Sequence, residues 1–526
     1  MKTFNTAVVC NPKKHYMIDI TNRIDRIIKN YIDPGNYFAI NRGRQYGKTT
    51  TLCLLAEKLR EKYYCLQISF EGGEELFRSD YMFASGVMDL IEEQLELEAV
   101  PEQLLEKWKD AIDAERPFQT LGKRITELCR FSDRPIVLMI DEVDRASDNQ
   151  RMISFLGMLR DKYIKRESGR TWTFQSVILA GVYDIKNLKL KIRSEESHQY
   201  NSPWNVAVKF KEDLSFTADE IAGMLSEYER DYHTDMDVRE ISRLIFEYTS
   251  GYPVLVSGIC KQIDENLAET SAFPNRAAAW VPEGVTEAVR LIEHENQPLF
   301  EDMIKQLKDF PQLKDIIRRI LFEGESIAFN AYNDVLNLAR MFDYVKSVNG
   351  RVAVANRIFE VVLYDYFLSE EETGNITKKD AELNRSQFIV DGRLDMELLL
   401  RKFAEHYAYV YADNDQKFVE KYARKIFLMY LKPVINGTGN YYIEAQTRDE
   451  KKTDIIVDYH AEQFLIETKI WYGQKYNEDG EKQLCGYLDR LQLKKGYMLT
   501  FSFNKNKKTG VQERNCGEKV LWEITV

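Results

Sequence analysis

Residues 37–50 read Tyr37-Phe-Ala-Ile-Asn-Arg-Gly-Arg-Gln-Tyr-Gly-Lys-Thr-Thr50, in which an apolar strand runs into a glycine turn and then into a helix. In a strand, turn and helix of this kind, backbone N–H groups and the helix N-terminus face phosphate groups. Lys48 would reach the β and γ oxygens of a nucleotide, and Thr49 would hold Mg²⁺. The sequence therefore predicts an ATP-binding phosphate loop made of Gly43, Arg44, Gln45, Tyr46, Gly47, Lys48, Thr49 and Thr50.

The first glycine of this pattern is displaced by one residue. The full pattern has glycine five residues before Gly47, where this chain has Arg42, and Gly43 follows directly. An ordinary glycine turn before a helix is the alternative interpretation. The strand before the turn and the helix after it favour the phosphate loop.

The composition indicates a globular, multidomain protein. Its 526 residues are 44% hydrophobic and 30% charged, which is long enough for roughly three or four domains. No apolar run approaches the ~18 residues that a membrane span needs, and the N-terminus lacks the apolar core of a signal peptide. We therefore expect a cytoplasmic protein without a membrane partner.

Cysteine usage and net charge bear on metal binding and on nucleic-acid binding. The seven cysteines are scattered, odd in number and without CxxC spacing, which favours reduced thiols and gives no zinc site. The net charge is −11. Any binding of nucleic acid must therefore use local basic patches.

A second motif follows about ninety residues after the phosphate loop. Residues 136–140 form a run of five apolar residues that is followed by Asp141-Glu142, as expected of a buried central strand whose carboxyl end points at the ligand crevice. Asp141 would join Thr49 in the Mg²⁺ shell, and Glu142 would polarise the attacking water as a catalytic residue. A strand that ends in solvated acids is the alternative.

Residues 173–181 predict another strand, followed by a basic run. Arg193 or Arg145 could act as an arginine finger, in cis or from a neighbouring subunit of a homo-oligomer. A solvated basic helix end explains either arginine equally well.

Residues 215–266 predict a helical lid, with Asp219-Glu220 in its first turn and Gly251-Tyr-Pro253 as a helix-breaking corner. The order of motifs (the phosphate loop, Ile-Asp141-Glu142, Leu-Ala-Gly181-Val-Tyr-Asp, Ser202-Pro-Trp-Asn and Ser250-Gly-Tyr-Pro) resembles the bacterial AAA-ATPase-like family over about residues 1–290. That resemblance implies a P-loop ATPase, and it makes the displaced glycine a variation of the family's loop.

The middle of the chain ends in a hairpin. Asn349-Gly350 separates two short apolar runs, which is a strong hairpin signature, and the helices before it suggest a winged helix. Such a module can contact DNA, but this wing has few basic residues beyond Lys346 and Arg351, which favours a rigid spacer. Residues 369–379 are polar and turn-rich, as expected of a linker.

Two strands near the C-terminus carry a second set of charged residues. Asp454 begins one strand, and the next has Glu467 and Lys469, whose side chains share a face because residues i and i+2 of a strand do. Two carboxylates can hold Mg²⁺ or Mn²⁺, and a lysine beside them can orient or deprotonate a water for phosphodiester hydrolysis. A surface hairpin with exposed charges is the alternative.

A helix after these strands carries Gln483 and Tyr487 one turn apart, and a further strand follows. This arrangement resembles the RecB-like branch of the PD-(D/E)XK nuclease superfamily, with Thr453 where the name-giving proline stands. The resemblance implies that Glu420 is the acid of the first helix, that Asp454 and Glu467 bind metal and that Lys469 assists the water. It also implies that Gln483 and Tyr487 place the DNA strand. Lys494, Lys495, Lys505, Lys507 and Lys508 would supply a basic patch, or else a solvated edge.

The sequence thus predicts an α/β multidomain protein: a P-loop NTPase core with a parallel sheet (1–214), a helical lid (215–295), a winged-helix-like segment (296–368), a linker (369–385) and a restriction-endonuclease-like domain (386–526). We expect nucleotide state to control a metal-dependent nuclease that acts on DNA rather than RNA. By analogy alone, such pairings suggest defence or mobile-element biology. The alternative is a nucleotide-switched sensor whose C-terminal domain binds nucleic acid or a protein without cleavage, and a helicase-like motor ranks last.

Overall fold

The computed structural model describes residues 2–526 except 8, 110, 144–149, 182–205, 324–326, 331, 373–387, 391–392, 411–423, 425–426, 429, 432–433, 436–438, 447–451, 461, 472–473 and 503–509. Contacts divide the chain into two compact units. The first comprises Met1–His233, Gly251–Lys261 and Leu338–Asp343, and the second comprises Thr234–Ser250, Gln262–Asn337 and Tyr344–Val526. The four boundaries between the predicted segments stay predictions.

A parallel four-stranded sheet lies at the centre of the first unit. Its strands run in the order β1-β4-β3-β2, and every neighbouring pair is parallel. The helices between these strands supply the crossover connections that parallel strands need. This confirms the P-loop NTPase-like sheet that the sequence predicts. The strands are β1 (Phe38–Asn41), β2 (Tyr64–Ser69), β3 (Ile136–Asp141) and β4 (Ser176–Gly181).

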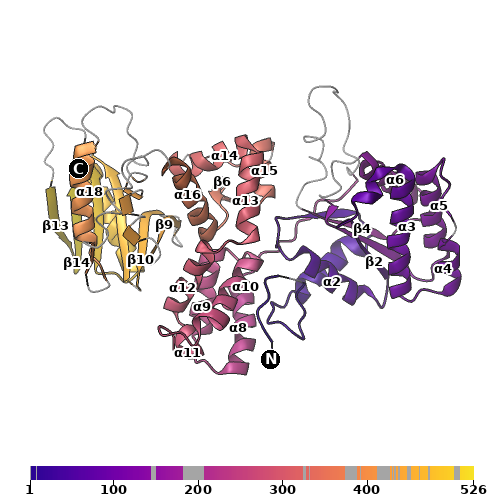
Figure 1. The fold of residues 1–526 in the computed structure, drawn as a ribbon, viewed down its shortest axis with the longest axis horizontal. Coiled ribbons are helices and arrows are strands. Elements are labelled where there is room, and N and C mark those ends of the chain that lie inside the picture. The colour runs from indigo at the N-terminus through magenta and orange to yellow at the C-terminus, as the bar shows by residue number, and fades with distance from the viewer. Residues whose placement is uncertain are drawn as a thin grey trace. The chain divides into compact units, whose positions relative to one another are not determined.

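Helices cover both faces of this sheet (Figure 1). Alternate residues of β3 explain the arrangement: Leu138 and Ile140 pack into the core with residues of α3, α5 and α6, whereas Val137 and Met139, equally buried, point to the opposite face of the sheet. The first unit contains α1 (Thr21–Ile27), η1 (Ile28–Ile32), α2 (Lys48–Leu59), η2 (Glu74–Arg78), α3 (Asp80–Leu97), α4 (Glu102–Trp108), α5 (Pro117–Phe131), α6 (Gln150–Glu167), α8 (Ala218–Tyr232) and α10 (Pro253–Lys261).

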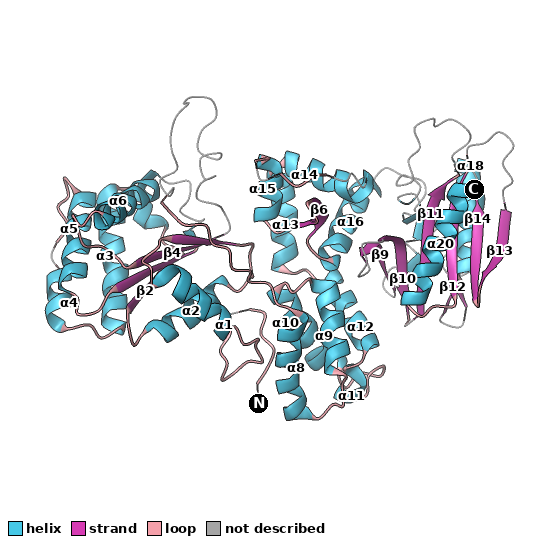
Figure 2. Cartoon of the chain, turned by 180° about the vertical axis from the view of Figure 1, so that it is seen from behind, coloured by secondary structure: helices cyan, strands magenta, loops and turns pink. Residues whose placement is uncertain are grey.

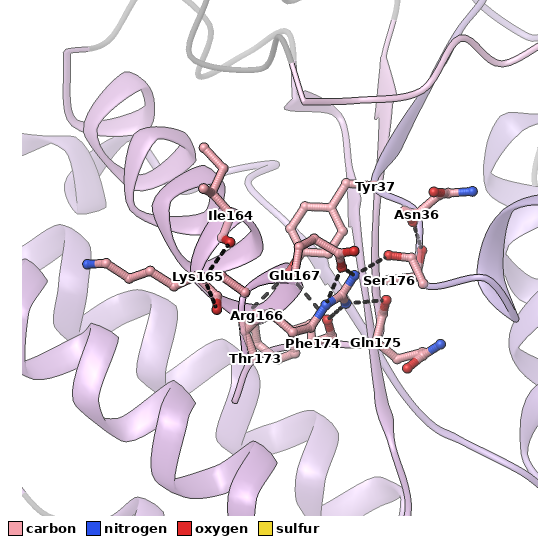
Figure 3. Close-up of polar contacts among 12 residues, drawn as sticks. Asn36, Tyr37, Ile164, Lys165, Arg166, Glu167, Thr173, Phe174, Gln175 and Ser176 are labelled. Atoms are coloured by element: carbon pink, nitrogen blue, oxygen red, sulfur yellow. Dashed lines mark hydrogen bonds and ion pairs between the residues drawn. The ribbon is translucent and has the colours of Figure 1, made fainter. Parts of the chain in front are cut away.

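One arginine fixes the edge of the sheet where β1 and β4 begin (Figure 3). The Arg166 guanidinium donates to the carbonyls of Phe174 and Gln175 at 2.7 and 2.8 Å, and to the carbonyl of Gly35 at 2.5 Å. Its guanidinium also lies over the Tyr37 ring, 5.6 Å from the centroid. Arg166 therefore ties the turn before β1 to the segment before β4, at the end of these strands opposite to the phosphate loop.

The predicted lid falls partly in each unit. Helix α8 begins with a capping box in which Thr217 accepts from the Glu220 backbone N–H and the Glu220 side chain accepts from the Thr217 backbone N–H. The second unit contains α9 (Val238–Thr249), η4 (Gln262–Leu267), α11 (Arg276–Ala279), α12 (Pro282–His294), α13 (Pro298–Asp309), α14 (Pro311–Arg318), η5 (Arg319–Glu323) and α16 (Arg357–Glu372). Helix α15 (Asp334–Met341) begins in the second unit and ends in the first.

The predicted wing is present. Strands β5 (Val345–Val348) and β6 (Arg351–Val354) form an antiparallel hairpin. Asn349 and Gly350 at its turn have φ of 49° and 75°, as a two-residue hairpin turn of the mirror-image type requires. The first residues of the predicted linker, 369–372, lie in helix α16, which ends at Glu372, and the rest of it lies outside the described residues.

The C-terminal region of the second unit contains a six-stranded mixed sheet (Figure 2). Its order is β13-β14-β12-β11-β10-β9, with parallel pairing from β11 through β12 to β14 and antiparallel pairing elsewhere. Two of its strands, β13 and β14, were not predicted. The elements are β7 (Ile389–Val390), β8 (Arg393–Leu394), α18 (Met396–Val410), β9 (Gly439–Gln446), β10 (Lys452–Tyr459), β11 (Glu462–Ile470), α20 (Gln474–Arg490), β12 (Lys495–Phe501), β13 (Gly510–Cys516) and β14 (Lys519–Thr525).

Two cysteines of the C-terminal region are paired. Cys485 in α20 and Cys516 in β13 form a disulfide, so the expectation of reduced thiols is wrong for this pair. Within the described part of the chain, no helix has the length and apolar character needed to cross a membrane.

Candidate functional site

The phosphate loop has the backbone that its glycine turn predicts. Gly47 has a φ of 76° and directly precedes helix α2, which starts at Lys48. No atom lies within 4 Å of a Cβ built on Gly47, so it is the left-handed backbone that favours glycine there. The helix N-terminus thus follows a tight turn, which is the geometry that exposes backbone N–H groups to an anion.

Lys48 is held at the mouth of this turn. Its Nζ donates to the carbonyls of Arg42 and Gly43 at 2.9 and 2.7 Å. These bonds fold the ammonium back over the loop and keep it next to the turn. A lysine in this place can reach the oxygens of a bound phosphate chain, as the sequence predicts.

Thr49 and Asp141 come together, although 92 positions separate them in the sequence. The Thr49 hydroxyl donates to Asp141 Oδ2 at 2.6 Å. The register of the sheet places Asp141 beside Ser69, at the carboxyl ends of β3 and β2. A hydroxyl and a carboxylate supply the oxygen ligands that Mg²⁺ prefers, so the two residues fit the predicted metal site.

Glu142 follows β3 in a left-handed conformation, with a φ of 54°. Its backbone N–H donates to Asp141 Oδ1 at 2.9 Å. Both oxygens of Asp141 are therefore hydrogen-bonded, one by Thr49 and the other by Glu142. Glu142 therefore directly follows the carboxylate that Thr49 bonds.

Three side chains that the sequence analysis missed hold the first half of the loop. The Gly43 N–H donates to Asp343 Oδ2 at 2.6 Å, and the Tyr252 hydroxyl donates to the Arg44 carbonyl at 2.7 Å. The hydroxyls of Tyr46 and Ser215 lie 2.6 Å apart. These partners are distant in the sequence and belong to no local pattern, so no sequence signature points to them.

The electrostatics of this half of the loop reflect its burial. Burial raises the pKa of Asp343 to about 6, although the Gly43 amide, Arg42 and Lys48 all favour its charged form. Burial also raises the pKa of Tyr46, and the neighbouring Asp343 adds to that shift. The ring of Tyr46 packs edge-on against Tyr252, with centroids 4.6 Å apart.

Thr50 and Gln45 are two further residues of the predicted phosphate loop. The Thr50 hydroxyl accepts from the backbone N–H of Cys10 at 3.2 Å, so this side chain bonds the N-terminal segment. Gln45 lies in the turn with a φ of 56°. The two candidate arginine fingers, Arg145 and Arg193, lie outside the described residues.

The C-terminal strands bring Glu467 and Lys469 together. Glu467 is fully buried, and its Oε1 lies 3.0 Å from Lys469 Nζ. Ile455 of β10 pairs with Ile466 of β11, so the backbones of Asp454 and Glu467, one position further on, lie at the same end of the two strands. The side chain of Asp454 and the whole of Glu420 lie outside the described residues.

Helix α20 covers the face of the sheet that bears this pair. A Cβ built on Gly480 would lie 3.2 Å from Lys469 Cε, so the helix packs closely on the lysine stem. One turn further along, Gln483 Nε2 donates to the Tyr487 hydroxyl at 3.3 Å, and Tyr487 is buried. Gln483 and Tyr487 are therefore neighbours, as their spacing predicts, on the helix that packs over Lys469.

The structure also adds an acid to this face. Glu523 of β14 is buried; it accepts from Thr500 at 2.9 Å and pairs with Arg514 at 3.2 Å. Met498 lies between Glu467 and Glu523 in the register, so the two acids are two strands, or roughly 10 Å, apart. The only sign of this buried acid in the sequence was that Glu523 interrupts the apolar run of residues 519–525.

One lysine of the predicted basic patch, Lys495, has partners of its own. Lys495 forms an ion pair with Glu397 and lies over the Trp522 ring, 5.1 Å from the centroid. In the wing, Lys346 donates to the Ser250 hydroxyl at 2.8 Å, and burial lowers its pKa. Lys505, Lys507 and Lys508 lie outside the described residues. Among the described residues, no group of three or more His, Cys, Asp or Glu side chains could hold a metal ion.

A family model described as AAA-like domain matches residues 10–335, which is more than half of the chain. Among solved structures, the chain is similar to the Walker-type ATPase of Pyrococcus abyssi, with 14% identity, 68% of this chain and 99% of that chain covered, and a TM-score of 0.44. It is also similar to the ORC2 protein of Aeropyrum pernix in its ADPNP-ADP complexes, with 14% identity, coverage of 67% and 95%, and a TM-score of 0.41. The RuvB Holliday junction branch migration motor of Thermotoga maritima matches with 11% identity, coverage of 64% and 92%, and a TM-score of 0.33. These TM-scores are too low to support an argument from the three structures. No curated protein matches the chain.

Proposed function

The chain belongs to the AAA-like domain family, and from that premise we propose that it binds and hydrolyses ATP and that its nucleotide state controls a metal-dependent DNA nuclease in its C-terminal region. The family match confirms the predicted AAA-like region and extends it beyond residue 290 to residue 335. The nuclease half of the proposal rests on the residues of strands β10 and β11 and of helix α20.

The contact between Thr49 and Asp141 is the observation that supports the ATPase half most strongly. A 2.6 Å hydrogen bond joins the start of α2 to the end of β3, next to the phosphate loop. When bound there, Mg²⁺ would neutralise charge on the phosphate oxygens. Lys48 would bind the same phosphates, and Glu142 would orient the attacking water and accept its proton.

The pair of Glu467 and Lys469 supports the nuclease half. A buried carboxylate beside an ammonium 3.0 Å away is costly to assemble, since both charges lose water. A metal ion bound by Glu467 and Asp454 would supply Lewis-acid chemistry to a phosphodiester. Lys469 would then orient the attacking water, while Gln483 and Tyr487 would contact the nucleic acid strand.

One crossed assay tests both halves. Wild type, Lys48→Ala and Asp454→Ala are each incubated with single- and double-stranded DNA and with RNA, with ATP or ADP, and with Mg²⁺ or Mn²⁺. We expect wild type to cut DNA in a manner that depends on metal and on nucleotide. Asp454→Ala should lose cutting but keep ATP hydrolysis, and Lys48→Ala should lose hydrolysis and the nucleotide dependence of cutting.

The outcomes separate the proposal from its alternative. Retained DNA binding without cutting in any metal would favour a nucleotide-switched sensor that binds without cleavage. ATP hydrolysis that is equal in Lys48→Ala and wild type would contradict the ATPase assignment. Cutting that is equal in Asp454→Ala and wild type would contradict the nuclease assignment.

A further inference from the structure

The phosphate loop is held from outside by a carboxylate 300 positions further along the chain. Asp343 Oδ2 accepts the Gly43 N–H at 2.6 Å, a short distance for an amide bonded to a carboxylate. Next to it, the Tyr252 hydroxyl donates to the carbonyl of Arg44 at 2.7 Å. Two consecutive residues of the loop are therefore fixed by side chains from two distant segments.

These contacts explain why the glycine of this loop stands at position 43. A Cβ built on Gly43 would lie 2.5 Å from Asp343 Oδ2 and 3.2 Å from the Tyr252 hydroxyl. Any larger residue would push the carboxylate away from the amide.

Asp343 itself is in an unfavourable state. Its φ is 58°, in the left-handed region that residues with a side chain seldom adopt. Its carboxylate is also largely desolvated beside the loop, with Arg42 and Lys48 as favourable neighbours and Asp213 as an unfavourable one. Asp343 thus combines a strained backbone with a desolvated carboxylate that bonds the phosphate loop. Such strain is typical of residues with a functional role, so Asp343 does more than pack against the loop.

We propose that Asp343 is a positioning residue of the phosphate loop. Its carboxylate holds the Gly43 amide and, together with Tyr252, keeps the first half of the loop in the conformation that binds nucleotide. The inference rests on the proposed ATPase function and names a control point of that same site. The chain leaves the first unit directly after Asp343 and enters the second at Tyr344. The residue that holds the loop is thus also the last residue before the chain changes unit.

The first test measures the loop without nucleotide. Hydrogen exchange is followed in the full-length protein for a peptide covering residues 38–47, with residues 136–141 of β3 as an internal reference. In Asp343→Ala we expect exchange in the loop to quicken by roughly ten- to hundredfold, the factor that corresponds to losing one hydrogen bond to a charged group. Asp343→Asn keeps an acceptor for the Gly43 N–H and should exchange like wild type. Unchanged exchange in Asp343→Ala would overturn the proposal.

The second test measures nucleotide affinity in the same variants. Asp343→Ala should bind ATP about tenfold more weakly than wild type, and Asp343→Asn should stay within about threefold of it. Gly43→Ala, which displaces the carboxylate from the other side, should weaken binding like Asp343→Ala. The matched control is Asp334→Asn, an exposed residue of α15, which should change neither readout.

The two tests fail in different ways. If Asp343→Asn binds ATP as weakly as Asp343→Ala, the hydrogen bond is not the cause and the proposal is overturned. If wild type binds no nucleotide at all, the proposed ATPase function fails, while hydrogen exchange still decides whether Asp343 holds the loop.

Discussion

The phosphate loop and the C-terminal strand pair each place a carboxylate where a metal ion is proposed, but they do so differently. At the loop, Asp141 receives hydrogen bonds from a neutral hydroxyl and a backbone amide. At the strand pair, Glu467 is buried against the ammonium of Lys469. A metal ion at Asp141 replaces a neutral donor, whereas one at Glu467 must share the carboxylate with a cation. We expect tighter Mg²⁺ binding at the first site, and the variants below probe the two sites separately.

The largest effect is expected at the strand pair. Glu467→Gln should slow DNA cleavage by about a thousandfold or more, since it removes the charge that would hold the metal ion and so several kcal/mol of transition-state stabilisation. Initial rates of cutting at saturating Mg²⁺ check this. Glu462→Gln, on the same strand but partly exposed, is the control and should cut like wild type. Equal rates in Glu467→Gln and wild type would remove Glu467 from the site.

The next effect concerns turnover at the loop. Glu142→Gln should slow ATP hydrolysis by a factor of about a hundred to a thousand, the usual contribution of a general base, because the amide cannot accept a proton from water. Its affinity for ATP should stay within about threefold of wild type. Steady-state hydrolysis and equilibrium binding are measured on the same preparation, with Glu127→Gln in helix α5 as the control. A loss of binding in place of turnover would show that Glu142 acts on the ground state.

Binding at the loop should respond to its lysine. Lys48→Ala should weaken ATP affinity about a hundredfold, because it removes charge-assisted bonds to the phosphates. Titration calorimetry measures this effect. Lys58→Ala, at the far end of the same helix and paired with Asp25 at the surface, should bind ATP normally. Equal affinities for all three proteins would mean that the loop is only a turn before a helix.

The last effect is on stability and depends on pH. The pKa of Asp343 is about 6 in the folded protein, above its value in an unfolded chain, so the folded state holds this proton more tightly. Wild type therefore loses stability as pH rises from about 4 to 6, and the penalty is fully present above pH 6. Asp343→Asn should raise the free energy of unfolding by up to about 3 kcal/mol at pH 8 and by less at pH 5. Thermal unfolding at the two pH values checks this, and an equal gain at both would contradict a role for ionisation.

Much of the fold follows from short patterns. The turn at Gly47, the hairpin turn at Asn349 and Gly350, and the capping box of Thr217 and Glu220 each depend on residues a few positions apart. The two-residue period of a strand likewise predicted that Glu467 and Lys469 share a face. Strands β13 and β14 were missed, since charged and polar residues interrupt their apolar pattern and only pairing with β12 completes them.

By itself the sequence determined the order of strand, glycine turn and helix around Lys48, and the sharing of one strand face by Glu467 and Lys469. Backbone preference and the two-residue period of a strand act over a few residues, so they can be seen in the chain. Only the tertiary structure decided that Asp141 meets Thr49 and that Asp343 meets Gly43. Those contacts depend on the register of a parallel sheet and on packing between segments up to 300 positions apart, which no local pattern encodes.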